Sequence, residues 1–332
     1  MSGCGGFTPG AYVGTMVGDV RALLVQDYGP PSQLALGELA DPRPGSGQVL
    51  VRISAAGLNP FDLKQLTGAF KGGSSSLEFP YVPGMDGAGT VLALGEGVQG
   101  VAVGDEIFGF FGRTPGTIAE LALLDVGDYL ALRPAALDAV HAAALPLSGV
   151  TAKTLLRAFE PAAGESLLVI GASGGIGMFV VQLAAAAGVE VLGTAAPAET
   201  AYVLGLGAAH ALDYTSEDPV ELALAVHPEG VDGVIDLVNG GDAVLSSARA
   251  LRPAGRFVSP LGGPLELGRG ITASYVSLTL LPGDLEDLAA RAASGALRVE
   301  VSRVYPFAAA GQAFVDFAAG HTRGKLVIDV RA

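Results

Sequence analysis

The first part of the chain, from Arg21 to about Val140, contains short apolar runs separated by glycine and proline. Residues 49–53, 89–94 and 118–123 are runs of this kind. Apolar runs of strand length that are bounded by turn-forming residues are typical of β-strands. The pattern therefore predicts that this part of the chain is rich in β-structure.

The pattern changes near His141, where apolar runs of strand length begin to alternate with segments of helical character. Such alternation predicts a parallel sheet with helices on both faces. After about Gly270 the pattern is mixed, and it ends in a clear strand. The expected strands are residues 167–170, 189–194, 231–238, 255–260 and 325–330, and the expected helices are residues 177–187 and about 198–206.

Length and composition narrow the classes of function. A chain of 332 residues, half of them hydrophobic, favours two domains, because single cores rarely grow past roughly 250–300 residues. The formal net charge is −14 and blocks of lysine or arginine are absent, which argues against nucleic acid as a partner. The apolar stretch at residues 180–187 is much shorter than the roughly 20 residues that span a bilayer, so no membrane partner is expected.

The single cysteine, Cys4, excludes a disulfide framework and any metal site built from several cysteines. This cysteine usage fits a reducing compartment, and we expect a cytoplasmic protein. Residues 1–18 lack a basic start followed by a long apolar run, so we expect a flexible extension there and not a signal peptide.

A glycine-rich turn follows the expected strand at residues 167–170 and opens the expected helix at residues 177–187. Glycine lets the backbone approach a pyrophosphate, and the helix start offers unpaired N–H groups and a partial positive charge. Chance is the alternative in a chain with 49 glycines, but the position between strand and helix favours dinucleotide binding. The turn consists of Gly171, Ala172, Ser173, Gly174, Gly175, Ile176 and Gly177.

The end of the next strand bears on which dinucleotide binds. NAD sites usually place an acidic residue there, about 20 residues after the turn, to bind the ribose hydroxyls. Here the strand ends in Gly193, Thr194, Ala195 and Ala196, without an acid. This strand end tolerates a 2′-phosphate and favours NADPH over NADH; the alternative is that Thr194 only ends a strand.

Further segments carry a family resemblance. They are Gly-Leu-Asn-Pro-Phe-Asp-Leu-Lys at residues 57–64, Pro-Gly-Met-Asp-Gly-Ala-Gly at 83–89, Val-Gly-Asp at 103–105, Leu-Pro-Leu-Ser-Gly-Val-Thr-Ala at 145–152, Leu-Gly-Ala at 206–208, Asp-Tyr at 213–214 and Arg-Gly-Lys-Leu-Val at 323–327. In this order the chain, from about Arg21 to its end, resembles the zinc-independent, quinone oxidoreductase-like (zeta-crystallin-like) branch of the medium-chain dehydrogenase/reductase superfamily.

The resemblance implies an α/β protein of two domains. A GroES-like, β-rich catalytic domain is expected at residues 19–140 and 270–332. A Rossmann domain, a doubly wound parallel sheet that binds the cofactor, is expected at residues 141–269. The cofactor is expected in the cleft between them.

Members of the family pair through the edge strand of the Rossmann sheet. Residues 271–281 carry several β-branched side chains and lie where that edge is expected. An exposed edge strand favours pairing with another strand. We therefore expect a homodimer.

The resemblance also implies cofactor contacts. Thr151 resembles the residue that contacts the nicotinamide carboxamide, and Tyr214 resembles the tyrosine near the adenosine phosphate. Other residues follow strands whose ends border the ribose and the nicotinamide. The expected cofactor site consists of the glycine turn with Thr151, Thr194, Tyr214, Val238, Asn239, Leu261, Gly262 and Lys325.

The chain departs from the family in the helix after Thr194. The lysine that binds NADPH in the family is missing, and the local residues are Ala198, Glu199 and Thr200. Glu199 would repel a 2′-phosphate if its side chain pointed inward. The expected preference for NADPH over NADH is therefore modest, about ten-fold.

The chemistry implied by the family needs no metal. Without a strong Lewis acid to polarise a plain ketone, hydride goes to an acceptor activated by conjugation. A quinone or the β-carbon of an α,β-unsaturated carbonyl qualifies, so the expected partner is a small electron-poor molecule.

Asn59, Asp62 and Lys64 match the family's Asn-Pro-x-Asp-x-Lys signature and are the expected catalytic residues. Asn59 can donate its amide to a carbonyl oxygen. Lys64 supplies charge or a proton in one interpretation; in the other, an Asp62–Lys64 pair only pins the loop.

Two other functions share this scaffold. A redox-neutral cyclase or lyase could keep the nucleotide as a structural element, because fold does not dictate function. A binding protein with a vestigial cofactor site is the second alternative, although the intact glycine turn argues against it.

We predict that the purified protein contains no stoichiometric zinc. The positions that match the cysteine, histidine and glutamate ligands of zinc-dependent relatives hold Asn59, Met85 and Asp86, and catalytic zinc needs about three protein ligands. The four histidines lack ligand spacing and are expected to be ordinary surface or cap residues. Elemental analysis checks this, and about one zinc per chain with activity lost to chelators would contradict it.

Overall fold

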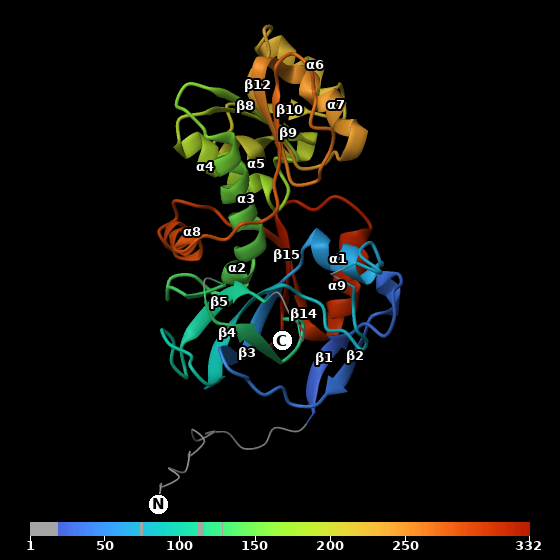
Figure 1. The fold of residues 1–332 in the computed structure, drawn as a ribbon, viewed down its shortest axis with the longest axis vertical. Helices are drawn as coiled ribbons and strands as arrows, with labels where there is room; N and C mark the ends of the chain where they lie inside the picture. Colours follow the sequence, from blue (N-terminus) through green and yellow to red (C-terminus); the bar gives the residue numbers. More distant parts are fainter. Residues whose placement is uncertain (1–18, 74–75, 112–115, 128) are drawn as a thin grey trace, which may run out of the picture.

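The structure is a computed structural model that describes residues 19–73, 76–111, 116–127 and 129–332. Residues 1–18, where an extension was expected, lie outside the described residues. The described chain forms two lobes stacked along the long axis of the molecule (Figure 1). Within these ranges no helix is long and apolar enough to cross a membrane.

One lobe is built on a six-stranded sheet in which every strand is parallel to its neighbours. The strand order is β10-β9-β8-β11-β12-β13, so β8 lies inside the sheet and β13 lies at an edge. The strands are β8 (Ser166–Ile170), β9 (Glu190–Ala195), β10 (His210–Asp213), β11 (Val231–Asp236), β12 (Leu251–Ser259) and β13 (Thr272–Tyr275).

Helices cover both faces of this sheet, as the alternation of its side chains requires. Leu167 and Val169 of β8 pack into one hydrophobic cluster, and Leu168 and Ile170 pack into another on the opposite face. Consecutive strand residues point to opposite faces, so a strand covered on both sides reads as a continuous apolar run. The helices of this lobe are α3 (Pro146–Phe159), α4 (Gly177–Ala186), α5 (Thr200–Gly205), α6 (Pro219–Val226) and α7 (Val244–Ser247).

The second lobe combines segments from both ends of the chain. Its seven-stranded sheet has the order β14-β15-β3-β4-β5-β7, with β6 also paired to β3, and a separate hairpin joins β1 and β2. The strands are β1 (Val20–Leu24), β2 (Ala35–Leu39), β3 (Gln48–Gly57), β4 (Asp86–Leu94), β5 (Glu106–Phe110), β6 (Leu121–Asp125), β7 (Leu130–Leu132), β14 (Val301–Pro306) and β15 (Lys325–Asp329). Its helices are α1 (Pro60–Leu66), α2 (Ala139–Ala143), α8 (Asp284–Ala293) and α9 (Ala310–Ala318).

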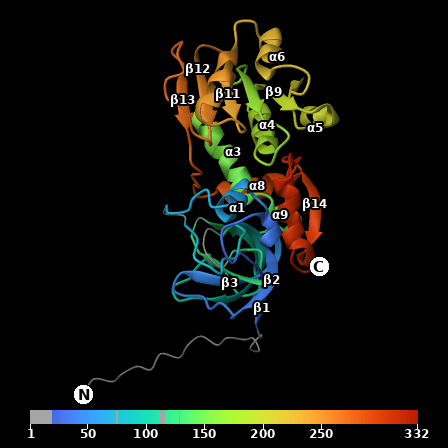
Figure 2. The same ribbon diagram turned by 90° about the vertical axis from the view of Figure 1, so that its right-hand side faces the viewer.

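The late strand β15 lies against the early strand β3, and the two are antiparallel. Figure 2 shows β14 and α9, in red, beside the blue β1, β2 and β3. The predicted fold class, a β-rich domain joined to a domain with a doubly wound parallel sheet, is confirmed by this architecture.

Several expected elements have different limits. The strand expected at residues 118–123 is β6 and begins later, at Leu121. The helix expected near residues 198–206 is α5, which follows a short 3-10 turn at Pro197–Glu199. Strand β13 pairs with β12, so the six-stranded sheet extends past the boundary expected at residue 270. The division into residues 19–140, 141–269 and 270–332 remains a prediction.

Candidate functional site

Two adjoining cavities lie at the carboxyl ends of the parallel strands. The interlobe cavity, about 240 Å³, is lined by residues of both lobes that include Leu58, Leu147, Ser148, Phe317, Lys325 and Leu326. The sheet-end cavity, about 510 Å³, is lined by residues that include Thr194, Tyr214, Val220, Asn239 and Ser247. Gly171, Val238 and His321 line both cavities. Ligands of open α/β sheets bind at such strand ends.

The glycine turn joins β8 to α4 along the wall between the cavities. Gly171 has a φ of +87°, a left-handed conformation that glycine adopts without strain. A Cβ atom on Gly177 would lie 2.1 Å from the Gly171 carbonyl oxygen, so only glycine lets α4 start this close to the strand. A Cβ on Gly174 would only make ordinary contact, 3.4 Å from the same oxygen. This side of the turn is open to a ligand, as a pyrophosphate cradle requires.

Thr194, near the end of β9, also holds the glycine turn in place. Its Oγ1 accepts a hydrogen bond from the Gly171 backbone N–H at 2.9 Å. Tyr214 lines the sheet-end cavity and is 42% exposed. Both residues therefore line the cavity at the strand ends, and their contact with the adenosine end of a dinucleotide stays a prediction.

Asp236, at the end of β11, organises the loop that carries Val238 and Asn239. Its buried carboxylate accepts the backbone N–H groups of Val238 at 3.0 Å and Asn239 at 2.9 Å, and the Asn239 side-chain amide at 3.0 Å. The Ser247 hydroxyl also donates to it. The sequence signal for this loop-organising role is that Asp236 is an acid at the end of an apolar strand, and Asp236 was not among the predicted site residues.

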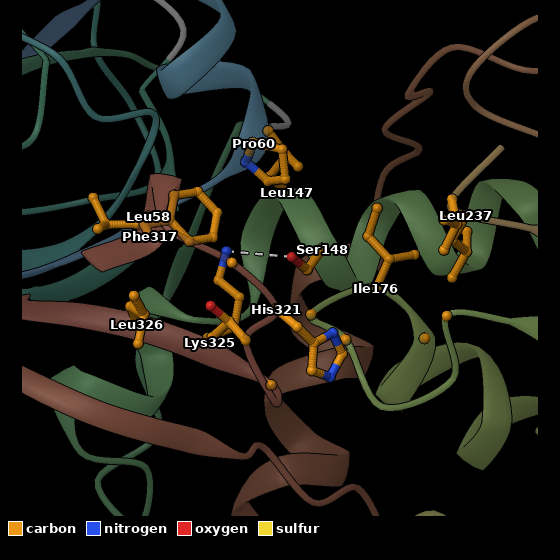
Figure 3. A pocket seen from close by; sticks show the side chains of 18 residues that line it. Leu58, Pro60, Leu147, Ser148, Ile176, Leu237, Phe317, His321, Lys325 and Leu326 are labelled. Carbon is orange, nitrogen blue, oxygen red and sulfur yellow. Dashed lines mark hydrogen bonds between the residues drawn. The ribbon is translucent and has the colours of Figure 1, made fainter. Parts of the chain in front are cut away.

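A buried polar cluster forms the floor of the interlobe cavity. Lys325 is 3% exposed, and its ammonium group donates to Asn59 Oδ1 and, at 3.3 Å, to Ser148 Oγ. Asp86 Oδ2 lies 3.6 Å from the same nitrogen. Figure 3 shows the Lys325 side chain extended towards Ser148. Burial lowers the pKa of Lys325, and the Asp86 and Asp62 carboxylates oppose this change.

The side chain of Asn59 makes its hydrogen bonds within this cluster. Its amide nitrogen donates to Asp86 Oδ2 at 2.9 Å and approaches the Gly57 carbonyl oxygen at 3.5 Å. Its oxygen accepts from Lys325. Asn59 is fully buried, so the structure gives it no free N–H for a ligand and favours a role in holding Lys325.

Asp62 and Lys64 lie on different sides of α1. Asp62 is fully buried and accepts the Asn59 backbone N–H at 2.8 Å, whereas Lys64 is exposed. Among the described residues no ion pair joins them, and Lys64 lines neither cavity. Burial raises the pKa of Asp62 to about 7, and the nearby Asp86 carboxylate adds to the increase.

Three other expected cofactor residues lie outside both cavity walls. Thr151 is buried in α3, and its hydroxyl donates to the Leu147 carbonyl oxygen at 2.7 Å. Leu261 and Gly262 follow β12, and the Gly262 carbonyl accepts the Gly241 N–H at 2.9 Å. The structure therefore does not bring these residues directly to the ligand space.

His321 is the residue that the sequence analysis most clearly missed. It follows α9 in the catalytic lobe, and its Nε2 lies 3.0 Å and 2.9 Å from the carboxylate oxygens of Glu199 in the other lobe. Ser173 Oγ of the glycine turn is 3.2 Å from the same nitrogen. Among the described residues, no group of three or more histidine, cysteine, aspartate and glutamate side chains could hold a metal ion.

Two family models match parts of the chain. Residues 45–133 match the family described as alcohol dehydrogenase GroES-like domain. Residues 206–328 match the family described as zinc-binding dehydrogenase.

Individual proteins match over nearly the whole chain. The NADPH-dependent alkenal/one oxidoreductase of Arabidopsis thaliana chloroplasts is 32% identical over 324 residues, which cover 93% of this chain and 79% of that protein. The structure of the Coxiella burnetii quinone oxidoreductase is 30% identical, with a TM-score of 0.85 over 94% of this chain and 100% of that one. The Escherichia coli quinone oxidoreductase, solved in complex with NADPH, is 26% identical, with a TM-score of 0.84 over 93% and 99% of the two chains.

We predict that Asp62→Asn flattens the pH dependence of stability. The pKa of Asp62 is raised from 3.8 to about 7 in the folded protein, so the stabilisation from its proton is full below about pH 4 and is lost as the pH rises to about 7. Asparagine keeps an oxygen for the Asn59 N–H and cannot ionise. Thermal denaturation should therefore show a melting temperature that falls by several degrees less than in the wild type over this range.

The matched control is Glu266→Gln, which removes an exposed acid outside the cluster. Its pH profile should follow that of the wild type. Equal slopes for Asp62→Asn and the wild type would show that Asp62 is ionised in the folded protein at acidic pH.

Proposed function

The chain belongs to the quinone oxidoreductase branch of the medium-chain dehydrogenase/reductase superfamily, and from this premise we propose that it is an NADPH-dependent reductase of quinones and α,β-unsaturated carbonyl compounds. The observation that carries the proposal is the meeting of two cavities at the glycine turn, one between the lobes and one at the strand ends. The family predicted from the sequence is confirmed.

The residues present fit NADPH. The turn leaves space at Gly174 for a pyrophosphate, and the end of β9 carries Thr194 in place of an acid. The Arabidopsis thaliana relative and the Escherichia coli structure both name NADPH. When bound, NADPH supplies the hydride for the reduction.

The interlobe cavity suits a flat acceptor. Its apolar side chains, Leu58, Leu147, Phe317 and Leu326, exclude water from the reacting carbons. Because Ser148 Oγ accepts a hydrogen bond from Lys325, its own hydroxyl hydrogen remains free to donate into the cavity. A donor in this position stabilises negative charge that develops on a carbonyl oxygen, and the Lys325 ammonium group strengthens it.

Asn59, Asp62 and Lys64 act differently in this proposal. Asn59 positions Lys325, and Asp62 holds the start of α1 through the Asn59 N–H. Lys64 is exposed and takes no part in the chemistry. The redox-neutral and vestigial alternatives have no specific observation in their favour, and the relatives described above are named as oxidoreductases.

We further propose that the protein works in the cytoplasm as a homodimer, with domains at the predicted boundaries except that the nucleotide-binding domain extends through β13. The single cysteine fits a reducing compartment. Strand β13 supports the dimer, because it lies at the edge of the six-stranded sheet and can extend that sheet across two copies.

The purified protein should oxidise NADPH in the presence of quinones and conjugated enones, and not with saturated ketones of similar size. It should bind NADPH about ten-fold more tightly than NADH, a difference of roughly 1.4 kcal/mol. Spectrophotometry measures NADPH oxidation with each acceptor, and calorimetry measures the dissociation constants of NADPH and NADH. Tight NADPH binding without turnover on any conjugated acceptor would refute the reductase assignment, and a preference for NADH would refute the cofactor assignment.

Gly174→Asp should lose NADPH binding by at least a hundred-fold and keep the fold. A carboxylate in this position occupies and repels the pyrophosphate site, while the space around Gly174 accepts a Cβ atom. Gly174→Ala is the matched control and should retain binding within about ten-fold, because it adds bulk without charge. Calorimetry measures the NADPH affinity and circular dichroism checks the fold. Unchanged affinity in Gly174→Asp would show that the nucleotide binds elsewhere.

Light scattering at micromolar concentration should give the mass of two chains. The expected contact is the free edge of β13, Thr272–Tyr275. A monomeric mass at these concentrations would exclude pairing through this edge.

A further inference from the structure

His321 and Glu199 form a link across the cleft. Glu199 ends the short 3-10 turn after β9, and His321 lies between α9 and β15 in the other lobe. The His321 Nε2 atom lies within 3.0 Å of both Glu199 carboxylate oxygens. A separate backbone hydrogen bond, from Gly324 N–H to the Ser173 carbonyl oxygen at 2.9 Å, holds the same loop against the glycine turn.

The imidazole of His321 lies where the cavities join. His321 lines both of them, and its side chain is 46% exposed, whereas the Glu199 side chain is 11% exposed. Its Nε2 is also 3.2 Å from Ser173 Oγ, a hydroxyl within the phosphate-binding turn. A dinucleotide that spans the two cavities must place its pyrophosphate beside this ring.

The charges of the pair determine what the ring can bind. A carboxylate near a pyrophosphate is unfavourable unless a cation lies between them. Both Glu199 carboxylate oxygens lie against Nε2, and in the imidazolium form both ring nitrogens carry a hydrogen. Nδ1 has no hydrogen-bond partner among the described residues, so in that form its hydrogen is available to an anion.

We propose that His321, oriented by Glu199, binds the pyrophosphate of the dinucleotide from the lobe opposite the glycine turn. The proposal rests on the proposed function, which supplies the nucleotide. His321 is the binding residue, and Glu199 is a positioning residue that acts through it. The glycine turn provides N–H groups on one side of the phosphates, and the imidazolium provides a charged donor on the other.

This role changes the expectation for Glu199. From the sequence, its carboxylate would repel a 2′-phosphate if the side chain pointed inward. In the structure the carboxylate is paired with His321 and lines neither cavity. Because NADPH and NADH share the pyrophosphate, the pair should affect both nucleotides equally.

The test compares dissociation constants of NADPH and NADH, measured by calorimetry, in His321→Ala and His321→Gln. Hydrogen bonds to charged groups contribute about 1.5–3 kcal/mol, so each variant should bind both nucleotides at least ten-fold more weakly. Glutamine can still donate to Glu199, so His321→Gln should keep the wild-type melting temperature. His210→Ala is the matched control: His210 pairs with Glu190 at 3.2 Å, lines neither cavity, and should bind as the wild type does.

Glu199→Gln tests the positioning role. It keeps an oxygen that accepts from Nε2 but removes the negative charge that pairs with the imidazolium, so binding of both nucleotides should weaken by about three-fold or more. Glu199→Asp keeps the negative charge, so it should bind both nucleotides more tightly than Glu199→Gln does. Unchanged or tighter binding in Glu199→Gln would show that the carboxylate does not act through His321.

The outcomes distinguish failure of the His321 proposal from failure of the proposed function. If the wild type binds neither nucleotide, the proposed function fails. If the wild type binds and both His321 variants bind equally well, only this inference fails. A loss confined to NADPH would move His321 to the 2′-phosphate and would also overturn the pyrophosphate assignment.

Discussion

The interlobe cavity depends on the accommodation of one buried ammonium group. A charge taken out of water is tolerated only when polar partners surround it. Lys325 finds these partners in Asn59 before α1, Asp86 at the start of β4 and Ser148 in α3. Its own strand, β15, must therefore meet all three elements in one register. The position of the cavity follows from where these four segments converge.

The same cluster explains why two neighbouring acids behave differently. Asp86 accepts the Leu147 backbone N–H at 2.9 Å and the Asn59 amide, and it lies beside Lys325. Asp62 has one carboxylate oxygen without a hydrogen bond, and among the described residues no ion pair joins it to a cation. One ammonium group cannot neutralise both acids. Below about pH 7, a protonated Asp62 leaves Asp86 as the acid beside Lys325 under the ligand space.

Sequence reasoning predicted what local patterns encode. The alternation of apolar runs predicted the parallel sheet, and the glycine turn appeared between β8 and α4 as expected. Thr194 was predicted from the end of its strand and Tyr214 from the family resemblance, and both residues line the sheet-end cavity. The polar cluster could not be predicted in this way. Lys325 and Asn59 are far apart in the chain, and only the antiparallel pairing of β15 with β3 brings them together. The link between His321 and Glu199 depends on the packing of two lobes, for which the sequence has no periodic signal.

The pairing of β15 with β3 also constrains how the chain can fold as it is made. The C-terminal end of β3, from Ala55 to Gly57, pairs with residues 327–329 of β15. Until those residues have left the ribosome, this part of β3 lacks one of its neighbours, and Asn59 and Asp86 lack the ammonium group that they surround. The parallel sheet between residues 166 and 275 can form earlier, because its strands follow one another closely in the chain. Synthesis should therefore produce an ordered nucleotide-binding lobe beside an incomplete seven-stranded sheet with an open strand edge. Nascent chains in such a state are prone to aggregation and benefit from chaperones.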